Sequence, residues 1–460
     1  MAIPAPADVP APGGDVFGHP RGLTVLFGTE MWERFSYYGM RALLVLYMVK
    51  YLLLPGNADG VIGYAGLRGG FEAVFGPLGV QPLASHIYGL YTGLVYLTPI
   101  VGGLLADRWL GRRRTVVLGA ALMAAGHFMM AVEGLFLMAL LTLILGNGAF
   151  KPNISTQVGA LYAPGDGRRD RAYSIFYVGI NLGAFMAPLV CGTLGEEVGW
   201  HYGFSAAGIG MTAGLVIYLR GERHLPPDDV AEMRARRRDA EPSGKGGGAV
   251  AALLLLCVPV TLFWATYEQS GNTIALWADG FTDRRVDLLV WSGEIPVTWF
   301  QAINPFLIFT LTPLVIAFWA RQAARGRETP TAVKMALGCL GVALANLVMA
   351  AAALGAQGGG ADWSWLIAYF VLLTLGELYL SPIGLSLVSK VAPARILSMM
   401  MGVWLATSFT GSLLGGWLGS LWSGMDKSAF FLMIATIAGA AALAIGAAAR
   451  PLRRMLGDGA

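Results

Sequence analysis

Residues 28–47 read GTEMWERFSYYGMRALLVLY and lie inside the apolar segment 22–53. About 20 mostly apolar residues suffice for a helix to cross a hydrocarbon layer of about 30 Å, so this segment predicts a membrane-spanning helix. At about 100° per residue, Tyr37 and the charged residues fall on one stripe of the helix. That stripe must face the interior of a helix bundle. Its charged members are Glu30, Glu33, Arg34 and Arg41.

The composition of the whole chain also indicates a membrane protein. Of its 460 residues, 56% are apolar and 13% are charged, whereas a soluble domain carries about 25% charged residues. We therefore expect an all-α polytopic membrane protein. A net charge of +4 from scattered basic residues argues against a nucleic-acid partner. Cys191, Cys257 and Cys339 lie in apolar stretches without metal-ligand spacing, so neither disulfides nor a metal site is indicated.

Twelve segments are long and apolar enough to be predicted as spanning helices. The two ends of the chain are predicted to be cytoplasmic tails, a disordered one at residues 1–21 and a short one at 450–460. The predicted helices are 22–53, 84–106, 114–132, 135–153, 172–191, 202–220, 249–275, 299–320, 332–353, 364–388, 396–421 and 428–448.

The basic residues predict the orientation, because cytoplasmic loops retain Lys and Arg. With the N-terminus inside, 24 of the 32 Lys and Arg residues fall on the cytoplasmic side, and both termini are cytoplasmic. Three more lie within helices. The outside keeps Lys50, Arg68, Arg284, Arg285 and Lys427.

One long connection, residues 221–248, predicts the domain boundary. It separates an N-terminal six-helix bundle, 22–220, from a C-terminal six-helix bundle, 249–449. Substrate is expected at the midplane between two such bundles. The connection contains Arg236, Arg237 and Arg238, which we interpret as topology determinants on a solvated linker; lipid binding or regulation is the alternative.

Three further charges lie within predicted helices, namely Lys151, Glu268 and Glu377. A charge at the centre of a bilayer costs about 2.5 to 3.5 kcal/mol, so each needs a partner or a water-filled cavity. With the four on the first helix they make seven, drawn from both halves, and we expect them to meet in one central cavity. The alternative is a set of buried ion pairs that only fixes helix register.

In chain order, the segments that carry these charges resemble the proton-dependent oligopeptide transporters of the major facilitator superfamily. The segment 30–39, EMWERFSYYG, resembles the ExxERFxYYG signature of that family, with Arg41 at the family spacing. The segment 103–113 is similar to the superfamily motif between helices 2 and 3. Further similar segments are 150–153, 176–183, 263–269, 301–305, 376–382 and 402–404.

The chain departs from the family pattern in three places. The linker 221–248 leaves no room for the two extra helices of many bacterial members. The helix 2 histidine of animal members falls on Gly89, which excludes a proton path through that side chain. Some bacterial members have a second glutamate just before Glu268, where this chain has Tyr267. Proton coupling is therefore expected to depend on carboxylates, chiefly Glu268.

The resemblance implies a role for each matching residue. A short peptide is a zwitterion, so a promiscuous carrier should bind its two ends through charge. Arg34 and Lys151 would hold the carboxylate and Glu377 the ammonium group. Gating would involve Asp107 and Arg108. Residues implied in proton coupling are Glu30, Glu33, Arg34, Arg41 and Glu268; those implied in substrate binding are Arg34, Tyr37, Tyr38, Tyr96, Lys151, Asn181, Trp264, Asn304, Glu377 and Trp404.

The pairing of Glu268 with Arg41 is the core of the mechanistic hypothesis. An apolar environment favours a neutral carboxylic acid, whereas a nearby guanidinium favours the carboxylate, so making or breaking the pair changes proton affinity. Protonation of Glu268 would release Arg41 and let one gate move. Peptide binding would displace a pair between Lys151 and Glu377.

These features together predict a proton-coupled symporter that imports di- and tripeptides by alternating access. We expect a monomer in a bacterial inner membrane, with no cofactor, no metal and no enzymatic activity. The main alternatives are a carrier of the same family for nitrate, a glucoside or a peptide-like drug. A polytopic membrane enzyme and a non-transporting nutrient sensor are disfavoured, because no nucleophile motif, metal cluster or soluble signalling domain is evident.

Overall fold

The computed structural model describes residues 16, 18–163, 165–228, 247–288, 291–356, 360–392 and 397–456. Within them, twelve helices of 18 residues or more follow the predicted segments in order. They are α1 (Arg21–Tyr47), α3 (Val80–Leu105), α4 (Arg112–Met129), α5 (Phe136–Ala160), α6 (Arg168–Ala187), α7 (Trp200–Gly221), α9 (Gly247–Tyr267), α11 (Trp299–Ala324), α12 (Thr331–Gly355), α13 (Ser364–Val391), α14 (Leu397–Ser420) and α15 (Lys427–Leu456).

Short elements connect or extend these helices. Between α1 and α3 lies α2 (Tyr64–Phe75), and α10 (Thr273–Gly280) follows α9. The loop after α10 forms an antiparallel hairpin of β2 (Arg285–Leu288) and β3 (Trp291–Glu294), in which Arg285 faces Glu294. Before it, β1 (Thr282–Asp283) pairs in parallel with β4 (Ala361–Asp362). Turns of π-helix extend α1 at Met48–Leu52, α3 at Ala106–Leu110 and α6 at Pro188–Gly192 and Leu194–Val198.

Nine of the described helical segments are long and apolar enough to cross a membrane. The long helices that are not among them are α1 with its internal charges, α4, which begins with three arginines, and α14, which is rich in glycine, serine and threonine. The count of twelve spans therefore stays a prediction.

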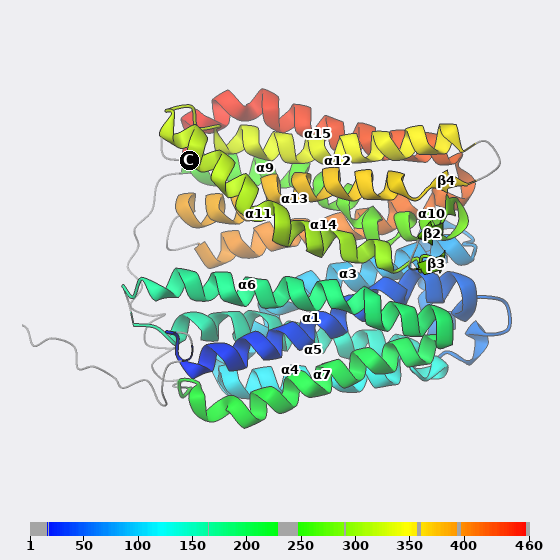
Figure 1. Cartoon of the computed structure of the whole chain (residues 1–460), viewed down its shortest axis with the longest axis horizontal. Coiled ribbons are helices and arrows are strands. Elements are labelled where there is room, and N and C mark those ends of the chain that lie inside the picture. The colour runs from blue at the N-terminus through cyan, green and yellow to red at the C-terminus, as the bar shows by residue number, and fades with distance from the viewer. Residues whose placement is uncertain are drawn as a thin grey trace, which may run out of the picture.

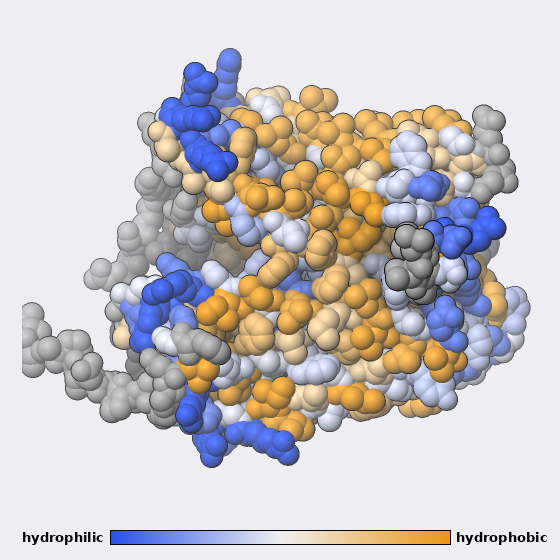
Figure 2. Space-filling view, in the orientation of Figure 1, coloured by the Kyte–Doolittle hydropathy of each residue, from blue (hydrophilic) through white to orange (hydrophobic). Residues whose placement is uncertain are grey.

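Figure 2 shows apolar residues over the middle of the molecule and hydrophilic residues at both ends. Several apolar side chains are exposed, with accessible fractions from 63% to 76%; they include Ile209, Leu255, Val258, Leu314 and Leu443.

The long helices pack as two groups. Helix α1 packs on α6 and α7, and α5 packs on α3 and α4; in the second group α12 packs on α13 and α15, and α14 packs on α9. Figure 1 shows the first group below the second, with α6 next to α11. The main contacts between the groups join α3 to α14 and α6 to α11.

The domain boundaries remain a prediction. Most of the predicted linker, residues 229–246, and the predicted tail up to residue 15 lie outside the described residues.

Two glycines allow a close approach between the groups, at α3 and α14. A Cβ atom built on Gly89 of α3 would lie 2.7 Å from the Cα of Gly416 in α14 and 2.7 Å from the carbonyl oxygen of Ser412. Distances this short leave no space for a side chain. Small residues allow helix backbones to touch in this way in membrane proteins.

The helix that begins with α9 breaks where its acidic residue lies. The α-helix ends at Tyr267, a 3₁₀ turn covers Glu268–Gly271, and Asn272 has φ −115° and ψ −93° before α10 begins. Gln269, at the break, donates a hydrogen bond of 2.9 Å to the Gly415 carbonyl and so connects the break to α14. The break aims Tyr267 and Glu268 at different neighbouring helices.

Candidate functional site

One guanidinium and two carboxylates occupy the middle of α1. Arg34 Nη2 donates a hydrogen bond of 2.8 Å to Glu33 Oε1, and Arg34 Nε also binds Glu33 Oε2. Glu30 Oε1 lies 3.2 Å from Arg34 Nε. Asn147 of α5 donates to Glu33 Oε1 at 3.4 Å. Because two acids face one base, Arg34 offers no excess positive charge to an anionic ligand until one carboxylate takes up a proton.

A second ion pair joins the two groups of helices. Arg41 Nη2 lies 2.6 Å from Glu268 Oε2, and the side chains are 9% and 2% exposed. The Tyr88 hydroxyl accepts a hydrogen bond of 2.9 Å from Arg41 Nε and donates one of 3.3 Å to Glu268 Oε2. The second oxygen of Glu268 is buried without a partner in the described part of the chain. The structure thus contains the pair on which the coupling hypothesis depends, with Tyr88 bridging its members.

Glu377 of α13 is surrounded by neutral hydrogen-bond donors. Its Oε2 accepts hydrogen bonds from the Tyr267 hydroxyl at 2.8 Å and from Asn304 Nδ2 at 3.0 Å. Asn304 Nδ2 also lies 3.0 Å from the hydroxyl of Thr374. The ion pairs found among the described residues do not include Glu377, so its charge is free to bind a cation.

Lys151 of α5 lies against an aromatic wall. Its Nζ is 5.2 Å from the ring centroid of Tyr96, and that ring lies 6.3 Å from the ring of Trp264. The hypothesis paired Lys151 with Glu377, but no such pair is formed between these two described residues in this structure. The aromatic face holds the ammonium group by a cation–π contact, which leaves the charge available to an anion.

The charged residues form one electrostatic network. Lys151 interacts electrostatically with both arginines of the α1 stripe, and so does Tyr38. Tyr38 also interacts with Glu268 and Glu377 of the second group of helices. Five of the predicted charges therefore lie within electrostatic range of one another across the two groups; they are Arg34, Arg41, Lys151, Glu268 and Glu377.

The remaining predicted binding residues surround this network. The Tyr37 and Tyr38 rings meet edge to face, 5.2 Å apart, and Arg34 lies 5.3 Å from the Tyr37 ring centroid. Asn181 is 5% exposed and donates to the Tyr177 carbonyl at 2.9 Å. Trp404 is also 5% exposed and packs against Gly384, where a Cβ atom would clash with its indole ring.

The predicted gating residues lie in the π-helical turn after α3. Asp107 is partly buried and Arg108 is exposed. The following turn is anchored within the first group of helices, since Arg113 donates from its backbone nitrogen to Asp228 Oδ2 at 2.7 Å and from Nε to the Pro226 carbonyl at 2.9 Å. Gly111, at φ 79°, makes that turn possible. The gating role stays a prediction.

A carboxylate of the first group caps a helix of the second. Glu196 accepts hydrogen bonds of 2.8 Å from the backbone nitrogens of both Val297 and Thr298, and one of 2.6 Å from the Thr298 hydroxyl. These donors precede α11, whose first residue, Trp299, donates from Nε1 to Thr193 Oγ1 at 2.7 Å. A carboxylate at a helix N-terminus satisfies free N–H groups and opposes the positive end of the helix dipole.

Other contacts between the groups lie at the same end of the molecule. Lys50 Nζ is 2.8 Å from Asp279 Oδ1 of α10. Gln81 donates to the Gly419 carbonyl at 2.9 Å and accepts from the Ser423 backbone at 3.1 Å. This end also carries α10, β2 and β3, on the right in Figure 1. These hydrogen bonds and this ion pair therefore join the two groups of helices at the end that carries α10.

A family comparison identifies the chain. The family model described as the POT family matches residues 113–232 and 247–436. The chain belongs to the POT family. This POT chain is 34% identical over 479 residues to the peptide transporter YePEPT of Yersinia enterocolitica, with 89% of each chain covered. It is 32% identical over 505 residues to a di-/tripeptide transporter of Lactococcus lactis subsp. cremoris, with 96% of this chain and 97% of the relative covered.

Solved structures of POT proteins share the fold. A mutant of a peptide transporter, POT, in complex with alafosfalin matches with a TM-score of 0.82 and 32% identity, over 97% of this chain and 98% of the other. A POT family transporter in complex with 5-aminolevulinic acid matches with a TM-score of 0.80 and 29% identity, over 96% and 99%. The all-α polytopic fold of this POT chain is thereby confirmed.

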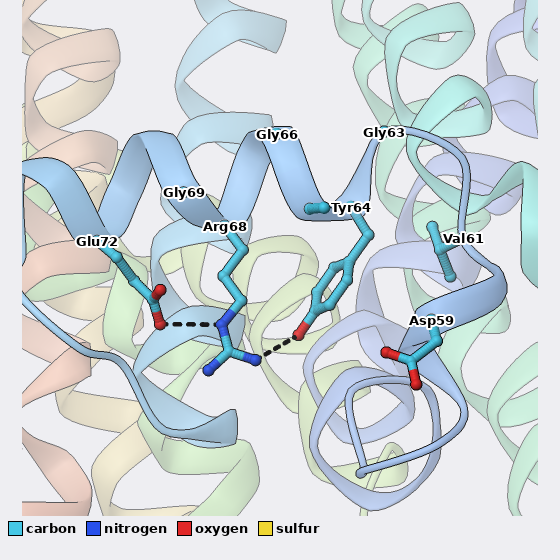
Figure 3. A pocket seen from close by; sticks show the side chains of 9 residues that line it. Asp59, Val61, Gly63, Tyr64, Gly66, Arg68, Gly69 and Glu72 are labelled. Atoms are coloured by element: carbon cyan, nitrogen blue, oxygen red, sulfur yellow. Dashed lines mark hydrogen bonds and ion pairs between the residues drawn. The ribbon is translucent and has the colours of Figure 1, made fainter.

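One surface hollow of the POT chain is unrelated to the predicted site. It has a volume of about 470 Å³ and is lined by α2 and the loop before it (Figure 3). Arg68 donates to Glu72 at 2.9 Å and to the Tyr64 hydroxyl at 3.3 Å, as the dashed lines in Figure 3 show. Hydrogen bonds from Arg68 and from the Leu78 backbone lower the pKa of Glu72 below its usual value. Arg68, Tyr64 and Glu72 satisfy one another, whereas Asp59, which also lines the hollow, has no ion-pair partner among the described residues.

Sequence reasoning missed three residues of the POT site. Tyr88 bridges the ion pair between the helix groups, Asn147 binds Glu33, and Tyr267 binds Glu377. Tyrosines and asparagines in apolar helices are common in packed interiors, so their type alone does not mark them. A signal was available for Tyr267, because it directly precedes the one acidic residue of its helix.

Proposed function

We propose that the chain is a proton-coupled symporter that imports di- and tripeptides by alternating access. It would act as a monomer in a bacterial inner membrane, with both termini in the cytoplasm. Residues 22–220 and 249–449 would be the two moving bundles. The proton gradient would drive transport, and no cofactor would be needed.

This proposal rests on two partly buried charges that have no ion-pair partner among the described residues. Lys151 lies in the first group of helices and Glu377 in the second, and neither forms an ion pair with a described residue. The other five charges of the predicted set are paired with one another. An unpaired charge inside a membrane protein is costly. A zwitterionic peptide supplies both missing partners, with its carboxylate for Lys151 and its ammonium group for Glu377.

The proton enters the proposal through Glu268. Its only charged partner among the described residues is Arg41, across the boundary between the helix groups. Protonation removes the attraction that joins the two groups at this level, because a neutral acid does not hold a guanidinium by charge. The pair therefore links proton binding to the relative movement of the two groups.

Uptake into liposomes that contain only the purified protein tests the proposal. With an alkaline interior, we expect dialanine and trialanine to accumulate above their external concentration and a protonophore to abolish accumulation. N-acetyl-dialanine and dialanine amide, which each lack one charge, should compete poorly, and nitrate should not compete. Failure to accumulate any free peptide would reject peptide symport, and accumulation of nitrate alone would favour the nitrate alternative.

A second substrate class is supported by one structural neighbour, which was solved in complex with 5-aminolevulinic acid. That molecule also has an ammonium and a carboxylate end, so Lys151 and Glu377 would recognise it in the same way. Competition of 5-aminolevulinic acid with labelled dialanine in the same liposomes would show whether this chain accepts it.

Removal of the Glu196 cap should open the end of the molecule that it closes. In Glu196→Ala, three hydrogen bonds to the start of α11 are lost, and bonds to a charged group contribute about 1.5 to 3 kcal/mol each. We expect a cysteine placed at Gln301, which contacts the Ala42 carbonyl across the boundary, to react about tenfold faster with an impermeant maleimide.

Glu197→Ala is the matched control for this experiment, because the neighbouring Glu197 is exposed and does not bind α11 among the described residues. Its labelling rate should equal that of the parent. Equal labelling of both variants would contradict the assignment of Glu196 as a contact that closes this end.

A further inference from the structure

Two consecutive residues at the end of α9 contact two different parts of the site. The Tyr267 hydroxyl donates to Glu377 Oε2 on α13 at 2.8 Å. The next residue, Glu268, forms the ion pair of 2.6 Å with Arg41 on α1. The α-helix ends between them and the 3₁₀ turn begins. A displacement of this turn therefore changes both contacts together.

The hydrogen bonds on Glu377 orient its carboxylate. Tyr267 and Asn304 both donate to Oε2, which leaves Oε1 without a hydrogen bond among the described residues. Oε1 also does not belong to the buried atoms that lack a partner, so it is accessible. Two donors on one oxygen fix the plane of the carboxylate and turn the other oxygen towards a ligand.

The phenol of Tyr267 is itself held in place. Its ring stacks on Phe263 with centroids 5.8 Å apart and planes at 17°, and meets Trp264 edge to face at 5.5 Å. The direction of its hydroxyl is therefore fixed by the end of α9, and not by Glu377. A rigid donor can impose an orientation on its acceptor.

We propose that Tyr267 is a positioning residue that orients Glu377 towards the peptide ammonium group and makes this orientation depend on the Arg41–Glu268 pair. The proposal rests on the proposed function, and adds a direct link between the proton site and the peptide site. Around this link, the charged and titratable groups that face Tyr267 are Glu377 on α13 and Tyr38 and Arg41 on α1. Those that face the ion pair are Tyr88, Tyr91 and Tyr96 on α3, Tyr37 and Tyr38 on α1, Lys151 on α5 and Glu377 on α13.

Tyr267→Phe tests the positioning role, because it removes the hydroxyl and keeps the ring. In reconstituted liposomes we expect the KM for dialanine to rise about fivefold with an unchanged maximal rate, since Asn304 still holds Glu377. The KM for N-acetyl-dialanine, which has no ammonium group, should not change. Tyr267→Gln, which retains a donor, should recover part of the loss.

The link to the proton site has a separate readout. In the parent, the KM for dialanine should vary between acidic and alkaline external pH, and in Tyr267→Phe this variation should be smaller. In the Glu377→Gln background, Tyr267→Phe should change KM by less than about twofold, because the carboxylate that it positions is gone.

The matched control is Tyr369→Phe, a buried tyrosine on α13 whose hydroxyl has no partner among the described residues. Its kinetics should match the parent. If the parent transports dialanine and Tyr267→Phe shows the parental KM and pH dependence, the inference is wrong and the proposed function stands. If the parent itself transports no peptide, the proposed function fails.

Discussion

Glu268→Gln is expected to abolish the accumulation of dialanine driven by a pH gradient while leaving exchange of dialanine across the membrane intact. Glutamine keeps the shape of the side chain but cannot take up or release a proton. The ion pair of 2.6 Å with Arg41 then loses its charge on the side of residue 268, and the proposed switch between paired and released Arg41 is removed. Uptake in a pH gradient should fall to the level of protein-free liposomes, and counterflow of labelled dialanine should persist.

Glu72→Gln provides the control, since Glu72 lies on α2 and binds Arg68 at the surface. An exposed ion pair contributes about 0 to 1 kcal/mol, so accumulation should match the parent. Uphill uptake by Glu268→Gln would refute carboxylate coupling at this position. Loss of both uptake and counterflow would mean that Glu268 is needed for the protein to cycle at all, which also contradicts the proposed role.

Glu377→Gln should raise the KM for dialanine by about 10- to 100-fold, the equivalent of about 1.5 to 3 kcal/mol for a hydrogen bond to a charged group. The variant keeps acceptor and donor atoms for Tyr267 and Asn304 but has no negative charge for the peptide ammonium group. The measurement is the concentration dependence of initial uptake in liposomes.

The substrate serves as an internal control for this variant. N-acetyl-dialanine has no ammonium group, so parent and variant should take it up with the same KM. Glu328→Gln, which removes the charge of an exposed carboxylate paired with the buried Lys334, should leave both substrates unaffected. An equal rise in KM for the two substrates would show that Glu377 supports the fold of the site and does not bind the peptide amine.

The fold was predictable because its signals are redundant along the chain. Each long helix begins within four residues of the start of its predicted segment, since a run of apolar residues marks a spanning helix clearly, whereas the ends differ by up to eight residues. The break between α9 and α10 was missed, although the polar run at residues 268–273, EQSGNT, interrupts the apolar pattern there. Helix α2 was also missed, since three glycines interrupt its apolar pattern at Leu67 and Phe71.

Candidate site residues could be selected where an ionisable side chain lies within an apolar, predicted membrane-spanning helix. The lone acid on its predicted helix and an otherwise unbalanced base suggested Glu268 and Arg41 as partners within the family pattern, and the structure pairs them. It could not predict how Arg34 is divided between Glu30 and Glu33, since that depends on side-chain geometry within α1. A pairing of Lys151 with Glu377 depends on how closely the two helix groups approach, which no local sequence pattern encodes.

The contact between Gly89 and Gly416 restricts where this chain can carry protonatable side chains. The two backbones touch at this level, so an imidazole at position 89 would drive α3 and α14 apart. A histidine at position 89 would therefore require compensating changes between Ser412 and Gly416. A titratable side chain at position 89 can therefore be accommodated only together with a change in the facing segment of α14.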